Sequence, residues 1–440
     1  MNLHRLLQQR EREQRPLRVG LIGAGKFGAM YLSQVRRTRG MRLTTVADLN
    51  PAAAREALTR VGFSAAELAE VACVDDGRRL IDRREVEIVI DATGSPAAGI
   101  SHVLACCQAR KHIVMVNVEA DALAGPWLAR QAREAGIVYS LAYGDQPALI
   151  CEMVDWARAC GFEVIAAGKG TKYLPAYHAS TPATVWGHYG ITPEDARLGG
   201  LNAQMFNSFL DGTKSAIEMC AVANATGLTA PAGLGFPPCG VDDLARVLRP
   251  QADGGQLPHR GQVEVVSSLE RDGRPVFRDL RWGVYVVFAA GGAYVERCFR
   301  EYGLVTDPSG RFTAMYKPYH LIGLELGISV ASVGLRGEPT GAPEAFNADV
   351  VATAKRDLKA GETLDGEGGF TVYGKLLPAA QSLREGALPL GLAHKVRLVR
   401  DVAAGQSVLW GDVEIDERQP AVGFRRDMER GSGLLARARG

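Results

Sequence analysis

Three features are scarce or missing in this sequence: net charge, a long apolar run and a paired cysteine motif. Its 440 residues carry 51 Lys and Arg against 49 Asp and Glu, a formal charge of +2. This balance gives no argument for nucleic acid, an anionic membrane or a polyanionic partner. The eight cysteines contain no C-x-x-C pair, so we interpret them as reduced side chains of a cytoplasmic protein.

The apolar segments predict neither a membrane span nor an export signal. Residues 1–18 are charged throughout and lack the apolar centre of a signal peptide. The uncharged run Met219–Val241 is interrupted by Gly, Pro and Asn, and Gly283–Val295 is too short to cross a bilayer. The composition, 47% apolar and 23% charged, is typical of a globular chain with two or three domains.

Residues 1–150 predict a doubly wound parallel α/β sheet, because short β-rich apolar runs alternate with amphipathic stretches. The predicted strands are Leu17–Ile22, Arg42–Ala47, Val86–Asp91, His112–Asn117 and Gly136–Leu141. The predicted helices are Met30–Thr38, Pro51–Arg60, Ala97–Ala109 and Gly125–Glu134, with Pro51 and Pro126 placed in first helical turns.

The remaining chain is predicted to form further domains. Residues 151–317 mix helix and strand signals, with a long helix over Leu201–Thr226 and a strand pair at Gln262–Val266 and Arg281–Phe288. Residues 318–340 are apolar at helical spacing and are expected to pack back onto the first domain. Residues 341–440 contain an internal repeat, Arg356–Leu364 and Arg400–Val408, which predicts a small all-β domain with two related corners.

A glycine-rich turn predicts a dinucleotide site. Gly23, Gly25 and Gly28 form G-x-G-x-x-G, with Lys26 and Phe27 inside it, directly after a strand and before a helix. The next strand ends at Asp48, whose carboxylate suits the adenosine ribose hydroxyls and favours NAD over NADP unless a cation such as Arg55 intervenes. An incidental turn is the alternative.

Two more strand ends are candidates for the nicotinamide side. Asp91-Ala-Thr93-Gly94 follows a buried strand, and Asn117 ends the next one. The carboxyl ends of parallel strands share one edge, so Thr93, Gly94 and Asn117 are predicted to contact the cofactor. For the segment Asp91–Gly94, an ordinary strand-to-helix turn is an equally good interpretation.

A polar loop follows near residue 170 and is predicted to hold substrate. Lys169 and Lys172 could pair with a carboxylate or phosphate, and His178 and His188 lie nearby in sequence. A solvated loop is the alternative, and no histidine spacing supports a zinc site.

The reacting centre is predicted on the long helix. Asp211, Lys214 and Glu218 are spaced three and four apart, which would place them on one helical face. An exposed ion-pair ladder is the plain alternative, but asparagines such as Asn207 on an otherwise apolar helix suggest a lined pocket. Lys214 would then exchange a proton with the reacting oxygen, oriented by Asp211 and Glu218.

These segments resemble a known family. The motifs are the fingerprint, D-A-T-G, V-N-V-E-A-D (Val116–Asp121), A-G-K-G (Ala167–Gly170), D-G-T-K-x-x-x-E-M (Asp211–Met219), A-N-A-T-G-L (Ala223–Leu228) and K-P-Y-H-L (Lys317–Leu321). Together they resemble homoserine-dehydrogenase-like oxidoreductases with a C-terminal SAF domain, a β-clip module. Within that group the chain is similar to the DXR-like, or type II, 1-deoxy-D-xylulose 5-phosphate reductoisomerases.

The resemblance implies a Rossmann domain, a dimerising α+β catalytic domain and nicotinamide-dependent hydride transfer on a small hydroxy or keto compound. It implies roles for Asp211 and Lys214 at the reacting oxygen, with Lys169 beside them, and adds Lys317 to the substrate residues. We expect a homo-oligomer, dimer or tetramer. An accompanying rearrangement would call for Mg or Mn, with Glu119, Asp145 and Glu218 as candidate ligands.

Two departures keep alternatives open. Homoserine dehydrogenases have Lys after the residue matching Asn117, where this chain has Val118 and Glu119. The type II reductoisomerases carry Arg where this chain has Asp48. A homoserine dehydrogenase and a non-catalytic dinucleotide sensor are the other two readings.

Overall fold

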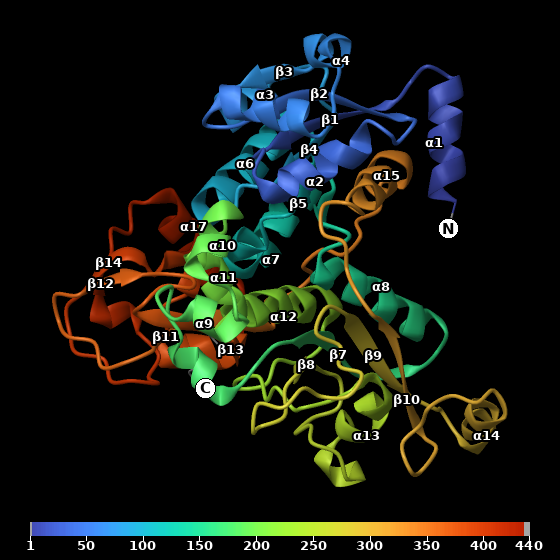
Figure 1. The fold of residues 1–440 in the computed structure, drawn as a ribbon, viewed down its shortest axis with the longest axis vertical. Coiled ribbons are helices and arrows are strands. Elements are labelled where there is room, and N and C mark those ends of the chain that lie inside the picture. The colour runs from blue at the N-terminus through green and yellow to red at the C-terminus, as the bar shows by residue number, and fades with distance from the viewer. Residues whose placement is uncertain (1, 435–440) are drawn as a thin grey trace. The chain divides into compact units, whose positions relative to one another are not determined.

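A computed structural model describes residues 2–434 of the chain (Figure 1). These residues form two compact units, each built from two separate stretches of sequence. The first contains residues up to 152 together with 320–344, and the second contains 153–319 together with the residues from 345 onward. No helix within residues 2–434 combines the length and apolar character that crossing a membrane requires.

The first unit is built on a six-stranded parallel sheet in the order β3-β2-β1-β4-β5-β6. Its strands are β1 Leu17–Ile22, β2 Met41–Ala47, β3 Ala72–Val74, β4 Ile88–Asp91, β5 His112–Met115 and β6 Tyr139–Leu141. The doubly wound α/β prediction is confirmed. The strand order reverses between β1 and β4, and this switch point is where open α/β sheets bind ligands.

Helices cover this sheet, and those from α3 to α7 begin at side chains that cap them. They are α1 Leu3–Arg12, α2 Lys26–Val35, α3 Pro51–Arg60, α4 Ala65–Glu70, α5 Gly77–Ile81, α6 Pro96–Ala109, α7 Val118–Glu134 and α15 Gly327–Arg336. Asn50 accepts hydrogen bonds from the first turn of α3. The predicted start of α7 near Pro126 is wrong, because Asn117 caps the helix earlier and Pro126 lies inside it.

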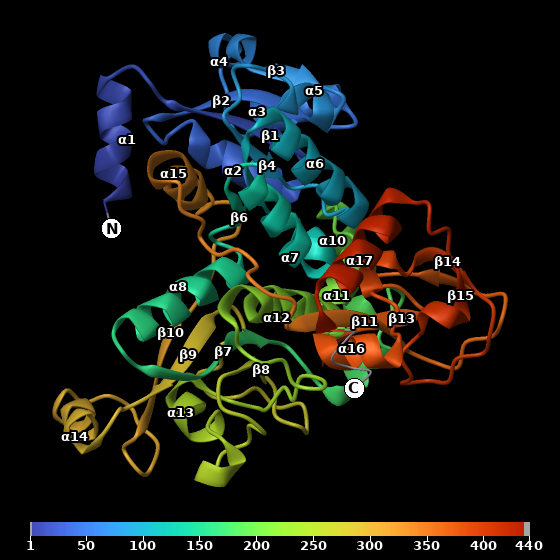
Figure 2. The ribbon, with the colours of Figure 1, turned by 180° about the vertical axis from the view of Figure 1, so that it is seen from behind.

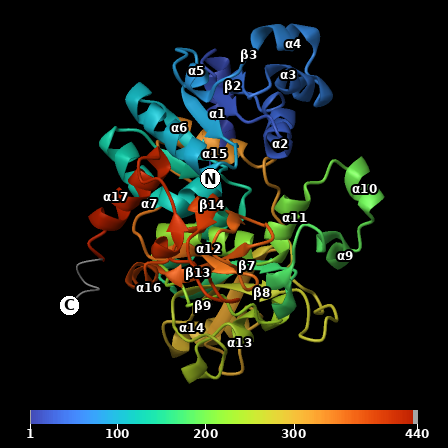
Figure 3. The same ribbon diagram turned by 90° about the vertical axis from the view of Figure 1, so that its left-hand side faces the viewer.

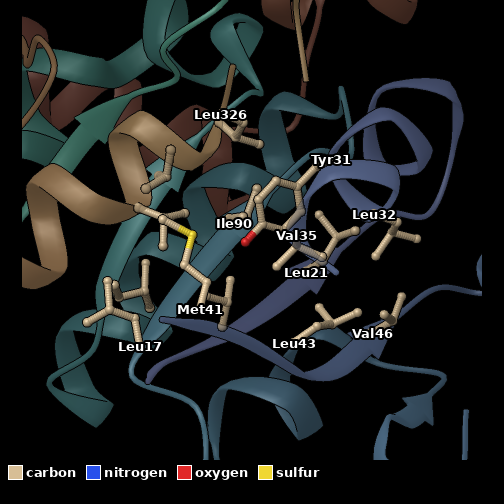
Figure 4. Packing of buried hydrophobic residues seen from close by; sticks show 14 of the residues in the cluster. Leu17, Leu21, Tyr31, Leu32, Val35, Met41, Leu43, Val46, Ile90 and Leu326 are labelled. Atoms are coloured by element: carbon tan, nitrogen blue, oxygen red, sulfur yellow. The ribbon is translucent and has the colours of Figure 1, made fainter. Parts of the chain in front are cut away.

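The core of the first unit joins distant parts of the sequence. Leu21, Tyr31 and Leu43 from the first sixty residues pack with Leu326, which comes just before α15 (Figure 4). At Gly334 in α15 a side chain would meet Leu17 at 2.8 Å, so the helix lies directly on the sheet. The α8 helix, Gln146–Ala159, begins in the first unit and ends in the second.

The second unit contains a mixed sheet in the order β10-β9-β7-β8. Its strands are β7 Glu163–Thr171, β8 Gln262–Ser267, β9 Val284–Ala289 and β10 Phe312–Lys317. The two strands predicted as a pair, β8 and β9, are separated by β7. The helices are α9 Val185–Tyr189, α10 Pro193–Leu198, α11 Ala203–Leu210, α12 Thr213–Thr226, α13 Leu244–Val247 and α14 Ala293–Glu301.

The single helix predicted over Leu201–Thr226 is wrong. Asp211 ends α11, and Gly212 adopts a left-handed φ of +90° before α12 begins. The Asp211 carboxylate accepts a hydrogen bond from the Thr213 N–H at 2.9 Å. Asp211 therefore lies in a turn and shares no helical face with Lys214 and Glu218.

The C-terminal part of the second unit is a small β module with two helices. It contains β11 Ala348–Ala354, β12 Thr363–Asp365, β13 Val372–Pro378, α16 Ala379–Glu385, β14 His394–Leu398, β15 Val413–Glu414 and α17 Pro420–Gly431 (Figure 2). The fully buried Arg425 of α17 forms an ion pair with Asp349 of β11 at 2.6 Å. Within the same unit α12 packs against β7 and β8 as well as β11 and β13 (Figure 3).

The two sequence repeats of this module pair with each other. Leu358 and Val402 exchange backbone hydrogen bonds in both directions. Asp357 accepts from the Ala404 N–H and Asp401 from the Ala360 N–H, both at 2.9 Å. Each repeat thus supplies the partner groups of the other around a local pseudo-twofold axis.

Candidate functional site

The glycine-rich turn has the geometry that a dinucleotide pyrophosphate needs. Gly23 has a φ of +94°, and a Cβ on Gly28 would lie 2.2 Å from the Gly23 carbonyl oxygen. These two glycines therefore allow the turn and the close packing of α2 on β1. A Cβ on Gly25 would meet nothing within 4 Å, so space is open where the N–H groups at the start of α2 face outward.

Asp48 lies directly after β2 and is tied to the same turn. Its Oδ2 accepts a hydrogen bond from the Ala24 N–H at 2.9 Å, and its Oδ1 accepts one from the Asn50 N–H at 3.0 Å. The carboxylate is partly exposed, and each oxygen retains a second lone pair. Ribose hydroxyls could donate to those lone pairs. Lys26 and Phe27 form the first residues of α2 beside this point.

A hydrogen-bond network fixes the loop after β4. The fully buried Asp91 accepts from the Thr93 N–H at 2.9 Å and from its hydroxyl at 2.7 Å. The other Asp91 oxygen lies 3.0 Å from Nδ1 of His102. Thr93 and Gly94 are exposed, and a Cβ on Gly94 would meet nothing within 4 Å. The loop therefore presents an open backbone edge at the switch point.

Asn117, which caps α7, holds this loop in place through hydrogen bonds. Its amide nitrogen donates to the Thr93 hydroxyl at 3.1 Å and to the Ser95 carbonyl at 2.8 Å, and its oxygen caps α7 through the Ala120 N–H. The Asn117 side chain is buried and its hydrogen-bonding groups are occupied. Its contribution to a cofactor site is to position Thr93.

The predicted metal ligands do not assemble into a site. Glu119 lies in the first turn of α7, and Asp145 is buried just before α8. No group of three His, Cys, Asp or Glu side chains able to hold a metal ion occurs within residues 2–434. The residues present therefore do not fit a resident Mg or Mn ion.

In the second unit, Lys169 and Glu218 form a buried ion pair. Lys169 is on β7 and Glu218 on α12, and their side chains are 8% and 5% exposed. Both were predicted at the reacting centre, and the structure brings them into direct contact. A Lys held by one carboxylate in a nearly dry environment can hold or transfer a proton at its Nζ. Lys214 is half-buried one helical turn before Glu218.

Asp211 has a different partner from the predicted one. Its fully buried carboxylate pairs with Nζ of Lys355 at 2.8 Å, and Lys355 also donates to the Ser180 and Gly369 carbonyls at 2.7 Å each. Burial raises the pKa of Asp211, and the Lys355 ammonium opposes this rise. The pair ties the α11–α12 turn to the C-terminal β module of the same unit.

The polar loop after β7 folds over itself. Nζ of Lys172 donates to the His188 carbonyl oxygen at 2.5 Å and lies 5.5 Å from the Tyr189 ring. Burial and the nearby Arg281 guanidinium lower the pKa of Lys172. The His188 ring itself lies 4.9 Å from the Tyr177 ring. Lys172 and His188 are thus neighbours in the structure. Their role in binding substrate stays a prediction.

His178 lies in an aromatic enclosure. Its Nδ1 is 2.7 Å from the Asp211 carbonyl oxygen, its Nε2 is 3.0 Å from the Tyr173 hydroxyl, and its ring stacks on Tyr373 at 4.4 Å. Burial lowers the pKa of His178, so the neutral ring donates through Nδ1 and accepts from Tyr173.

Two other predicted substrate residues differ in their surroundings. Asn207 is fully buried and bonded to the Ser180 hydroxyl and to the Ser180 and Gly368 carbonyls, which makes it a structural bridge. Lys317 pairs with Val284 across β9 and β10, and Val284 pairs with Lys169 on its other side. Because directly paired residues share a face, Lys317 and Lys169 belong to the same face of the sheet.

Sequence reasoning missed Lys355, Tyr373 and His102. Lys355 and Tyr373 lie more than a hundred residues from their partners Asp211 and His178, and no spacing rule connects such distant positions. His102 lies on α6 at a distance of eleven residues from Asp91, but across a turn. A lone His carries no signal of its own in sequence.

Two oxidoreductase family models match successive parts of the chain. Residues 17–116 match the model described as "Oxidoreductase family, NAD-binding Rossmann fold", and residues 144–326 match "Oxidoreductase DRL, catalytic domain". The two matches cover the nucleotide turn and the Lys169–Glu218 pair respectively. The chain thus carries a segment like an NAD-binding Rossmann fold, followed by a segment like an oxidoreductase catalytic domain.

Comparison with solved structures finds more distant likenesses. A probable dehydrogenase from Thermotoga maritima is 14% identical, with a TM-score of 0.36, over 73% of this chain and 90% of that one. The WlbA dehydrogenase from Bordetella pertussis is 19% identical, with a TM-score of 0.27, over 36% and 46%. The scyllo-inositol dehydrogenase from Lactobacillus casei is 12% identical, with a TM-score of 0.28, over 40% and 48%. The chain thus spans less than half the length of the last two. No curated protein matches it.

Proposed function

We propose that the protein transfers hydride between NAD and a CH–OH or keto carbon of a small anionic or polyhydroxylated compound. The observation that carries this proposal is the open backbone at Gly25 beside the Asp48 carboxylate. Asp48 favours NAD because a 2′-phosphate would be repelled by its charge. The resemblance supplies 1-deoxy-D-xylulose 5-phosphate as the precedent for substrate, with an isomerisation accompanying hydride transfer.

The site residues divide into two roles. Gly23, Gly25, Gly28, Asp48 and the Thr93–Gly94 loop hold the dinucleotide. When bound, the nicotinamide supplies or accepts the hydride. Lys214 exchanges the proton of the reacting oxygen, and the Lys169–Glu218 pair sets the charge around it. Lys172, His188 and Lys317 supply cationic or polar groups for the substrate, while Asn207 and His178 maintain the loop that carries them.

A matched pair of glycine substitutions tests the cofactor site. Gly25→Ala adds a methyl group to open space, so the fold should keep its stability while NAD affinity falls about tenfold or more, because the methyl group blocks the pyrophosphate. Gly28→Ala meets the Gly23 carbonyl at 2.2 Å and should instead destabilise the fold by about 1–3 kcal/mol. Fluorescence titration with NADH and urea unfolding measure the two effects. Unchanged NADH affinity in Gly25→Ala would contradict the assignment.

Lys214→Met tests the proton-exchange role. Turnover should fall at least about a hundredfold while NADH affinity stays within about twofold, because Lys214 acts on the substrate oxygen. The assay follows nicotinamide absorbance on polyols, sugar acids, keto acids and deoxyxylulose phosphate. If turnover and cofactor affinity fall together, the residue has a structural role.

The same assays distinguish the two alternative functions, a homoserine dehydrogenase and a non-catalytic dinucleotide sensor. Turnover of homoserine would favour homoserine dehydrogenase activity, and the lack of a Lys after Asn117 predicts none. NADH binding without turnover of any compound would favour a non-catalytic sensor. We also propose that the repeat-bearing module is an SAF domain and that the protein is cytoplasmic. We further propose that it forms a homo-oligomer, and light scattering of the purified chain would test this oligomeric state.

A further inference from the structure

A second concave site lies in the first unit, at the amino ends of its strands. The cavity has a volume of about 320 Å³ and is lined by residues that include Arg10, Leu17, Glu87, Arg110, Lys111 and His112. Leu17 and His112 begin β1 and β5, and Glu87 comes just before β4. The glycine-rich turn and Asp48 follow the carboxyl ends of β1 and β2 in the same parallel sheet, so this cavity is at the opposite edge.

The lining carries an excess of positive charge. Arg10, Arg110 and Lys111 contribute three cations, against a single carboxylate from Glu87. That carboxylate already has a partner, since Glu87 forms an ion pair with Arg18 at 2.9 Å and accepts the Arg18 N–H at 3.1 Å. In the last turn of α6, the Cys106 carbonyl accepts the Arg110 and Lys111 N–H groups, and the Cys107 carbonyl also accepts the Arg110 N–H. The Lys111 ammonium donates to the Arg83 carbonyl oxygen, which is a neutral partner, so the lining still has more positive than negative groups.

His112 adds a directed donor. Its Nδ1 accepts a hydrogen bond from the Val138 N–H at 3.0 Å, which fixes the remaining ring proton on Nε2. Burial lowers the pKa of His112, so the ring stays neutral and keeps this tautomer at neutral pH. A neutral N–H donor beside guanidinium and ammonium groups suits oxygen atoms of phosphate or carboxylate.

The helix α1 closes one side of the site and connects it to the fold. Arg10 belongs to the last turn of α1, which packs beside α15 (Figures 1 and 2). The Glu11 carboxylate next to it accepts the Gly40 N–H at 3.0 Å. Within α1 only Leu7 is buried, so apolar burial alone holds this helix weakly.

We propose that this cavity binds a small multivalent anion carrying phosphate or carboxylate groups. The anion contacts Arg10 of α1, Arg110 and Lys111 at the end of α6, and the His112 ring. It thereby holds α1 against the sheet from the edge opposite the nucleotide. Phosphate esters and polycarboxylates share this chemistry, and the experiment below distinguishes them.

The test is calorimetric titration of the full chain with inorganic pyrophosphate and, separately, with citrate. Saturating NAD occupies the glycine-rich turn, and sodium chloride keeps ionic strength constant because exposed charges are screened by salt. We expect saturable binding of at least one probe and an upward shift of the thermal unfolding midpoint with that probe. Pyrophosphate binding alone indicates a phosphate ester as ligand, and citrate binding alone indicates a polycarboxylate.

Two substitutions change the site in opposite directions. Arg110 has a left-handed φ of +54°, so Arg110→Gly removes the guanidinium while relieving backbone strain, and affinity should fall about tenfold without loss of stability. Glu87→Gln removes the one acid of the lining and releases Arg18, so affinity should rise. A gain of affinity cannot come from misfolding.

Arg278→Gly is the matched control. Arg278 also has a left-handed φ, of +51°, and carries one positive charge, but it belongs to the second unit and does not line the cavity. Its affinity for the probe should equal that of the wild type. Absence of binding by both probes, equal affinity in wild type and Arg110→Gly, or loss of binding on saturation with NAD would each overturn the proposal.

Discussion

At the scale of single residues, we propose that the carboxylate of Asp48 selects NAD over NADP. Both of its oxygens are already held by backbone N–H groups, so the charge stays fixed beside the ribose position. A fixed negative charge disfavours a 2′-phosphate and accepts hydrogen bonds from a 2′-hydroxyl.

Asp48→Ala should therefore weaken NAD binding about tenfold and leave NADP affinity equal or higher. Fluorescence titration with NADH and NADPH gives both affinities from one protein sample. Asp48→Asn is the control, because it keeps the oxygen that accepts the Ala24 N–H while removing the charge. A ratio of the two affinities that is the same in all three proteins would refute the ribose assignment.

A buried carboxylate in the second unit makes stability depend on pH. Glu264 of β8 is 4% exposed, and burial raises its pKa to about 7, although the N–H groups of Gly235, Phe236 and Val265 bond to it. A raised pKa means that the folded state retains a proton that the unfolded state has lost. Stability is therefore greatest below about pH 4.5 for this group and falls as pH rises toward 7.

Urea unfolding at pH 5 and pH 7.5 should show a larger loss of stability in the wild type than in Glu264→Gln. Between these two pH values the wild type should lose about 2 kcal/mol more than the variant, because most of the shift in the Glu264 pKa lies between pH 5 and pH 7.5. Asp121 of the first unit, whose pKa burial also raises to about 7, is present in both proteins and cancels in the comparison. Parallel pH profiles would mean that Glu264 does not titrate in this range.

At the scale of elements, the α11–α12 turn depends on a lysine from the C-terminal module. Lys355 and Asp211 are 2% and 0% exposed, so neither charge is solvated and each needs the other. The same lysine also donates to the Ser180 carbonyl, in the polar segment that follows β7. The β module is thus an integral part of the second unit.

Lys355→Met should destabilise the protein by about 3–5 kcal/mol, because it leaves the buried Asp211 charge without a partner. The double variant with Asp211→Asn should recover much of this loss, since the amide oxygen still accepts the Thr213 N–H and carries no charge. Denaturant unfolding of the three proteins measures both effects. Equal stability of the single and double variants would show that no buried charge is involved.

The sequence predicted the local structure of these elements better than it predicted which distant residues pair with each other. The glycine turn and five of the six parallel strands follow local patterns, and the structure has them. The sixth strand, β3, was missed. The break at Asp211-Gly212 was also signalled, since this dipeptide is typical of turns, but the three-and-four spacing of charges obscured it. The pairs Lys169–Glu218 and Asp211–Lys355 arise from tertiary packing, which no spacing rule contains.

At the scale of the whole molecule, each of the two units is built from two stretches of sequence that alternate along the chain. The second unit combines its central sheet with the repeat module, and the first unit combines its sheet with α15. The buried residues Leu326, Val330 and Val333 complete the core around β1 and β4. Truncation before residue 320 should therefore expose apolar surface in the first unit as well as remove the module.

This interleaving also orders events during synthesis. The strands of the nucleotide-binding sheet emerge from a ribosome long before α15, so their core stays open while the whole central sheet of the second unit is made. An incomplete core with exposed apolar surface is prone to aggregation and attracts chaperones. The return of α15 to β1 thus makes the first third of the chain dependent on translation as far as residue 336.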